Sequence, residues 1–236
     1  AALKAGDIDA ATNLNAPEAV IAFQADPKFE VAIGTTEGET ILALNNARAP
    51  LNDVRVRRAI AHAIDRQAIV DGAMFGFGTP IGTHFAPHNP AYVDLTETYP
   101  HDPVRARELL AEAGVSDLKL TLKLPPPAYA RRGGEIVVAQ LKEAGIAVEI
   151  IPVEWAQWLE QVFRGDDFDM TIVSHTEPMD IGIYARDKYY FNYDSPAFKA
   201  VIKRLNTTSD PIARNALLAV AQDIITTDSV NAYMFQ

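Results

Sequence analysis

The sequence predicts an α/β fold built on a mixed, largely parallel sheet flanked by helices. Short apolar runs typical of strands alternate along the chain with amphipathic segments of helical period. Several of these helices end at a glycine that is followed at once by the next apolar run, as is common in α/β units. With 48% apolar and 22% charged residues among 236, the composition is that of a chain with a globular core.

The first forty residues carry weaker signals than the rest. Residues 1–5 are typical of a last helical turn, with Gly6 in the C-cap position. We expect short strands at 7–12 and 29–35, on either side of a helix at 16–24.

The strongest element is a helix over 53–71, which follows a predicted strand at 39–45. Asn52 and Asp53 are suited to cap the helix. Its apolar stripe consists of Val56, Ala59, Ile60, Ala63 and Ile64. Residues 72–100 then show no sustained period, and long irregular segments inside a domain are often functional.

From residue 102 onward, helices and strands alternate. Asp102 and Pro103 open the first of these helices, because Asp caps helices and proline is favoured at the first helical position. In chain order we expect helix 102–113, strand 118–124, helix 134–144, strand 146–152, helix 154–164, strand 168–174, helices 195–206 and 210–227, and strand 230–235.

Charge and cysteine content exclude several kinds of partner and site. The 21 basic and 31 acidic residues give a formal net charge of −10, which repels polyanions, so we expect no nucleic-acid partner. The sequence has no cysteine, which excludes disulfides and thiolate metal sites. Its apolar stretches are far shorter than the roughly 20 residues that span a bilayer.

Polar residues follow the apolar strand 168–174. His175, Glu177 and Asp180 stand where ligands gather in open α/β sheets, beyond the carboxyl end of a strand. We expect these three residues to bind a ligand, and we expect no resident metal or cofactor. A solvated turn capped by Asp180 is one alternative. A metal or acid–base site at His175 and Glu177 is another, although a metal site needs a third ligand.

Two aromatic segments supply further candidates. Phe77 and Phe85 lie in a glycine-rich stretch that lacks the last glycine of a dinucleotide-binding motif. Tyr184 and Tyr190 lie among charged residues shortly before the helix at 195–206. We expect all four to line a ligand cleft, because aromatic side chains with a few polar groups are typical of such clefts. Packing beneath a loop, or at a domain rim, is the alternative.

The basic cluster Arg55, Arg57 and Arg58 opens the helix at 53–71. Cations in a first helical turn oppose the helix dipole, so we expect compensation by Asp53 or another acidic neighbour. A structural ion-pair network is favoured over ligand binding.

Catalysis has little support in the sequence. Ser174 and His175 are neighbours whose side chains alternate faces on a strand, and no Gly-x-Ser-x-Gly motif occurs. The rival to a binding function is a metal-dependent hydrolase that uses His175, Glu177 and a distant histidine, either His84 or His88.

The run from Asn52 to Arg66 reads Asn-Asp-Val-Arg-Val-Arg-Arg-Ala-Ile-Ala-His-Ala-Ile-Asp-Arg. It closely resembles the signature of the family 5 extracellular solute-binding proteins, which include the oligopeptide-, dipeptide- and nickel-binding proteins of ABC importers. The likeness continues through Leu3–Ala10, Ala106–Gly114, Gln140–Ile146, Asp167–Met170 and Asn192–Phe198.

The resemblance implies a periplasmic-binding-protein-like type II lobe. Residues 1–40 would be a remnant of lobe I, 41–228 the ligand-cleft lobe II, and 229–236 a hinge strand returning toward lobe I. Family members are longer chains, so we expect this sequence to be part of a protein that has a first lobe elsewhere.

The resemblance also implies a binding protein and no enzyme. Such a protein would take a peptide or similar small solute between two lobes and deliver it to an ABC permease in the membrane. A periplasmic or extracellular location follows, with a lipoprotein anchor as an option. Where the family commonly has Trp and then an acidic residue facing the ligand, this sequence has His175 with Glu177 and Asp180. We expect Glu177 or Asp180 to contact a cationic group of the ligand.

Overall fold

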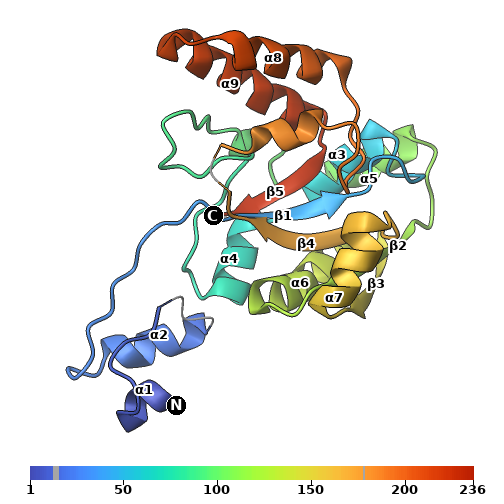
Figure 1. Cartoon of the computed structure of the whole chain (residues 1–236). Coiled ribbons are helices and arrows are strands. Elements are labelled where there is room, and N and C mark those ends of the chain that lie inside the picture. Colours follow the sequence, from blue (N-terminus) through green and yellow to red (C-terminus); the bar gives the residue numbers. More distant parts are fainter. Residues whose placement is uncertain (13–15, 178) are drawn as a thin grey trace.

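The computed structural model describes residues 1–12, 16–177 and 179–236. Its centre is a five-stranded sheet with strand order β3-β2-β4-β1-β5 (Figure 1). The strands are β1 (Glu39–Leu44), β2 (Lys119–Leu124), β3 (Ala147–Pro152), β4 (Met170–His175) and β5 (Asn231–Phe235). Strand β2 pairs in parallel with β3 and β4, whereas β1 is antiparallel to β4 and β5. The predicted mixed sheet is confirmed, and every described strand except β1 runs in the same direction.

Helices cover both faces of the sheet (Figure 1). One face packs against α3 (Val54–Ala63), α4 (Arg66–Met74), α5 (Pro103–Glu112) and α6 (Ala128–Glu143). The other packs against α7 (Trp155–Trp158), its π-helical continuation η2 (Leu159–Arg164), η3 (Ile181–Ala185), α8 (Pro196–Thr207) and α9 (Pro211–Thr227). The remaining described helices are α1 (Ala2–Ala5), α2 (Pro17–Gln24) and η1 (Thr96–Thr98).

Strand β1 shows how the sequence produces two cores. Leu42 and Leu44 pack into the cluster beneath α3 to α6, while Ile41 and Ala43 pack into the cluster on the opposite face. All four side chains are fully buried, because successive residues of a strand point to opposite faces and both faces are covered. This double burial explains why residues 41–44 of the strand are all apolar.

Three sequence-based expectations about elements were wrong. Residues 7–12 and 29–35 form no strands, and no ladder among the described residues includes them. The helix expected at 53–71 is two helices, because the chain leaves the helical conformation at Ile64 and Asp65 accepts a hydrogen bond from the Ala68 amide as a second N-cap. Helix α6 also begins at Ala128, six residues before the expected start at 134.

The arginines of α3 bind mostly backbone carbonyl groups, which corrects the predicted ion-pair network. Arg57 is 7% exposed and donates to the carbonyls of Leu51, Asp228 and Ser229 at 2.8, 2.9 and 3.0 Å. Arg58 donates to the carbonyl of Thr227. Arg55 alone follows the expectation, with an exposed pair to Asp53. These hydrogen bonds thus join the signature helix α3 to the connection between α9 and β5.

Among the described residues, no helix has both the length and the apolar character needed to cross a membrane.

Candidate functional site

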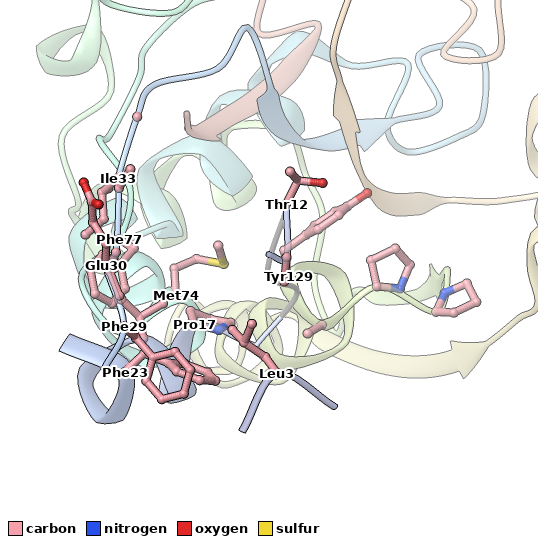
Figure 2. Close-up of a pocket in the computed structure, with 18 of the residues that line it drawn as sticks. Leu3, Thr12, Pro17, Phe23, Phe29, Glu30, Ile33, Met74, Phe77 and Tyr129 are labelled. Atoms are coloured by element: carbon pink, nitrogen blue, oxygen red, sulfur yellow. The ribbon is translucent and has the colours of Figure 1, made fainter. Parts of the chain in front are cut away.

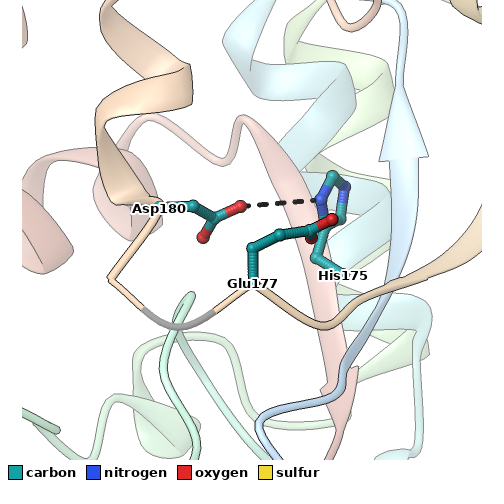
Figure 3. Close-up of side chains that lie close together, drawn as sticks. All are labelled: His175, Glu177 and Asp180. Carbon is teal, nitrogen blue, oxygen red and sulfur yellow. Dashed lines mark ion pairs between the residues drawn. The ribbon is translucent and has the colours of Figure 1, made fainter.

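The predicted polar residues gather at the carboxyl end of β4. His175 is the last residue of this strand, and the segment after it brings Glu177 and Asp180 back toward the imidazole (Figure 3). One ligand atom from each of the three residues lies within 4.8 Å of the others. Because β1 runs antiparallel to β4, its first residue, Glu39, pairs with His175 in the sheet register and reaches the same edge.

Asp180 is held by a histidine that precedes it by 96 residues. Nε2 of His84 donates to Oδ1 of Asp180 at 2.6 Å, and Nδ1 of His84 accepts from the Tyr184 hydroxyl at 3.1 Å. The Tyr184 oxygen accepts in turn from the amide of Asn231 and the hydroxyl of Tyr233, both on β5. His84 has no exposed surface, so this relay, the chain of hydrogen bonds from β5 through Tyr184 and His84, holds the Asp180 carboxylate in position from the core side.

His175 is buried and neutral. Its Nε2 lies 3.0 Å from the Tyr190 hydroxyl, and its ring stacks on the Tyr190 ring. Burial, followed by the nearby His84, lowers the pKa of His175 to about 4, so the imidazole carries no charge at neutral pH. Its Nδ1 is 3.9 Å from Oδ2 of Asp180, which is too far for a hydrogen bond.

The geometry brings together His175, Glu177 and Asp180, and no other described histidine joins them as the distant ligand that a metal-dependent hydrolase would need. Both ring nitrogens of His84 are engaged by Asp180 and Tyr184. His88 is exposed and pairs with Glu37 at 2.7 Å. Within the part of the chain that is described, neither histidine joins the group of three.

Glu39 is a residue of this site that sequence reasoning missed. It is 1% exposed, and Oε2 of its carboxyl group has no hydrogen-bond partner among the residues that the structure describes. Burial, with the charge of Asp180 adding to it, raises the pKa of Glu39 to about 9. The available signal was an acidic residue at the head of a strand that is otherwise apolar.

The four aromatic candidates are divided between two places. Tyr184 and Tyr190 are each 1% exposed, with their hydroxyls turned to His84 and His175, so they support the polar residues from the core. Phe85 is also 1% exposed and packs in the same core. Phe77 lies elsewhere, and a ligand-binding role for any of the four stays a prediction.

Phe77 lines a cavity of about 1090 Å³ between the N-terminal segment and the helices α4 and α6 (Figure 2). The lining includes Phe23 and Phe29 from the N-terminal segment and Tyr129 from α6. Of the seven predicted site residues, this cavity includes Phe77 alone. This apolar cavity and the carboxylate cluster are therefore separate features, and we place the candidate site at the cluster because the charged groups converge there.

Comparison with known proteins gives consistent results. The family model described as "Bacterial extracellular solute-binding proteins, family 5 Middle" matches residues 1–196. The heme-binding protein A of Haemophilus influenzae is 29% identical over 147 residues, which are 60% of this chain and 27% of that protein. The dipeptide-binding protein of Escherichia coli is 30% identical over 131 residues, or 53% of this chain and 24% of that protein.

Among solved structures, the oligopeptide-binding protein AppA of Bacillus subtilis, in complex with a nonapeptide, has a TM-score of 0.87 at 22% sequence identity. The match covers 99% of this chain and 51% of AppA. The fold is therefore that of one half of such a protein. The chain spans about a quarter of the length of the two curated relatives named above.

Proposed function

The chain belongs to the bacterial extracellular solute-binding proteins of family 5, and on this premise we propose that it binds the cationic group of a peptide or similar small solute. The family consists of substrate-binding proteins, which are not enzymes. We assign the binding to the carboxylate cluster at the end of β4, with Asp180 and Glu177 as the groups that contact the solute.

The observation that carries this proposal is a concentration of carboxylates without a lysine or arginine partner. Among the described residues, the basic side chains within 4.0 Å of Asp180 and Glu37 are histidines, and neither Glu39 nor Glu177 has a basic group at that distance. Neighbouring carboxylates repel one another, so a cation bound between them gains attraction from several groups at once. A site of this kind favours an ammonium or guanidinium group over a neutral or anionic one.

The relay beneath Asp180 supports the same assignment. A carboxylate that is already oriented loses little conformational freedom when a ligand binds. His84 and Tyr184 hold Asp180 through buried hydrogen bonds, and they leave Oδ2 facing the cluster.

The remainder of the proposal follows from the family. The protein would enclose its solute between this lobe, residues 41–228, and a first lobe of which residues 1–40 would be a remnant and toward which the hinge strand 229–236 would return. Closure of the two lobes would present a surface to an ABC permease. We place this activity in the periplasm or at the outer cell surface. The heme-binding and dipeptide-binding relatives leave several solute classes open, and the cluster favours those that carry an amine.

Titration calorimetry with a panel of dipeptides and tripeptides tests the proposal. We expect Asp180→Ala or Glu177→Ala to weaken binding about 10- to 100-fold, since a hydrogen bond to a charged group contributes about 1.5–3 kcal/mol. Asp187→Ala is the matched control, because Asp187 is an exposed carboxylate of the same segment that pairs with Lys199. Unchanged affinity in both cluster variants would exclude this site.

A further inference from the structure

Glu39 occupies an unusual position for a carboxyl group. It begins β1, it is 1% exposed, and its Oε2 atom has no hydrogen-bond partner within the described part of the chain. An unpaired carboxylate in such a place is costly, so the group must either hold a proton or bind a cation.

Among the described residues, the groups around Glu39 supply no cation. Those whose charges act on its carboxyl group are Asp180, Glu37 and Glu177. His175, which lies opposite Glu39 on the neighbouring strand β4, is neutral because burial lowers its pKa to about 4. On the β5 side, the charge of Glu39 acts on the buried phenol of Tyr233.

The two other histidines near the cluster each have a carboxylate partner of their own. His84 is hydrogen-bonded to Asp180, and His88 is paired with Glu37. With no cation to pair with, Glu39 keeps its proton at neutral pH when the site is empty, in keeping with a pKa raised to about 9.

We propose that Glu39 takes part in recognising the solute's cationic group and exchanges its proton for that cation on binding. The inference rests on the proposed function of the same carboxylate cluster. The O–H bond of the Glu39 carboxyl group breaks, its proton passes to solvent, and the carboxylate left behind pairs with an incoming ammonium group. One positive charge leaves as another arrives, so the buried group is never an unpaired anion.

An ammonium group fits this exchange better than a metal ion. The atoms that are spaced to hold a metal belong to His175, Glu177 and Asp180, and Glu39 is outside that group. A metal bound by those three would not be bonded to the Glu39 carboxyl group. An ammonium group has three donors, one for each of the carboxyl groups of Glu39, Asp180 and Glu177.

The experiment measures proton release by calorimetry on the 236-residue chain and on Glu39→Gln, with lysyl-alanine as the probe. Titrations at pH 7 in phosphate and in Tris give the number of protons released, because the two buffers take up protons with different heats. We expect Glu39→Gln to release about one proton fewer per peptide than the unmodified chain. From pH 6 to 8.5 we also expect the affinity of the unmodified chain, divided by that of Glu39→Gln, to rise up to tenfold per pH unit.

Two controls test whether the proton release depends on the ammonium group of the peptide and on Glu39. Doubly N-acetylated lysyl-alanine lacks both ammonium groups and should release no proton. Asp187→Asn should behave as the unmodified chain does. Glutamine is close in shape to a protonated glutamic acid, so the Glu39→Gln chain should keep its fold, which circular dichroism checks.

A flat affinity ratio with equal proton release overturns the role of Glu39 and leaves the proposed function standing. Absence of peptide binding in both chains at millimolar concentration overturns both proposals. Titration with Zn²⁺ alone separates the remaining case: if only the metal displaces the Glu39 proton, the site takes a metal ion and the ammonium assignment is wrong.

Discussion

Arg57 of the signature helix should be a major determinant of stability. Its buried guanidinium group donates to three backbone carbonyls, from Leu51 before α3 and from Asp228 and Ser229 between α9 and β5. Arg57→Met keeps most of the side-chain volume and removes the donors. Each carbonyl left unsatisfied costs about 1–3 kcal/mol. The variant no longer has to bury the guanidinium charge, which offsets part of this loss; the same burial lowers the pKa of Arg57 in the unmodified chain. We expect a net loss of about 3–5 kcal/mol, a large share of a typical total stability.

Urea unfolding followed by far-ultraviolet circular dichroism measures this loss as a lower midpoint at unchanged slope. Arg58→Met is the matched control, because Arg58 lies next in the same helix, is partly exposed, and donates only to the Thr227 carbonyl among the described residues. We expect the control to lose less than about 1 kcal/mol. Equal losses in the two variants, or a loss below about 1 kcal/mol for Arg57→Met, would refute the view that this arginine joins α3 to β5.

Two further variants test packing and titration. Gly82→Ala should destabilise the fold by about 2 kcal/mol or more, because the added Cβ would overlap the backbone of Leu95 and Thr96. Gly182→Ala is the control and should have little effect, because its added Cβ meets no atom within 4 Å. Equal melting temperatures for the two variants would contradict the predicted clash at Gly82. Glu39 keeps its proton in the folded chain up to about pH 9 but loses it above about 4.5 when unfolded. Its contribution to stability is therefore complete below pH 4.5 and is lost as the pH rises to 9, so the stability of the unmodified chain relative to Glu39→Gln should fall over this range. A pH-independent difference in urea midpoints between these two chains would show that the pKa of Glu39 is not raised.

Local capping made much of the fold predictable. Asp102 accepts hydrogen bonds from backbone amides at the start of α5, as its position before proline suggested, and Ser195 and Asp210 cap α8 and α9 in the same way. A local sequence pattern does not specify whether another strand will lie beside it. Residues 7–12 and 29–35 have strand-like sequences, yet no described strand pairs with them. The break at Asp65 was hidden for a related reason, because the apolar stripe of α3 and α4 continues on both sides of it.

The candidate site was predictable only where it is continuous in the sequence. His175, Glu177 and Asp180 follow a buried strand, and the rule that ligands gather beyond the carboxyl ends of strands located them. His84 meets Asp180 from 96 residues away, and Glu39 meets the cluster only because β1 pairs antiparallel with β4. Contacts of this kind depend on sheet order, which the sequence pattern did not specify.

The central claim is that the carboxylate cluster binds an amine-bearing solute. Native mass spectrometry of the 236-residue chain, incubated with a defined peptide mixture and compared with Asp180→Asn, tests this most directly. We expect the unmodified chain to retain peptides with free amines in preference to their N-acetylated forms, and Asp180→Asn to lose that preference. Equal retention of free and acetylated peptides, or an unchanged preference in Asp180→Asn, would contradict the claim.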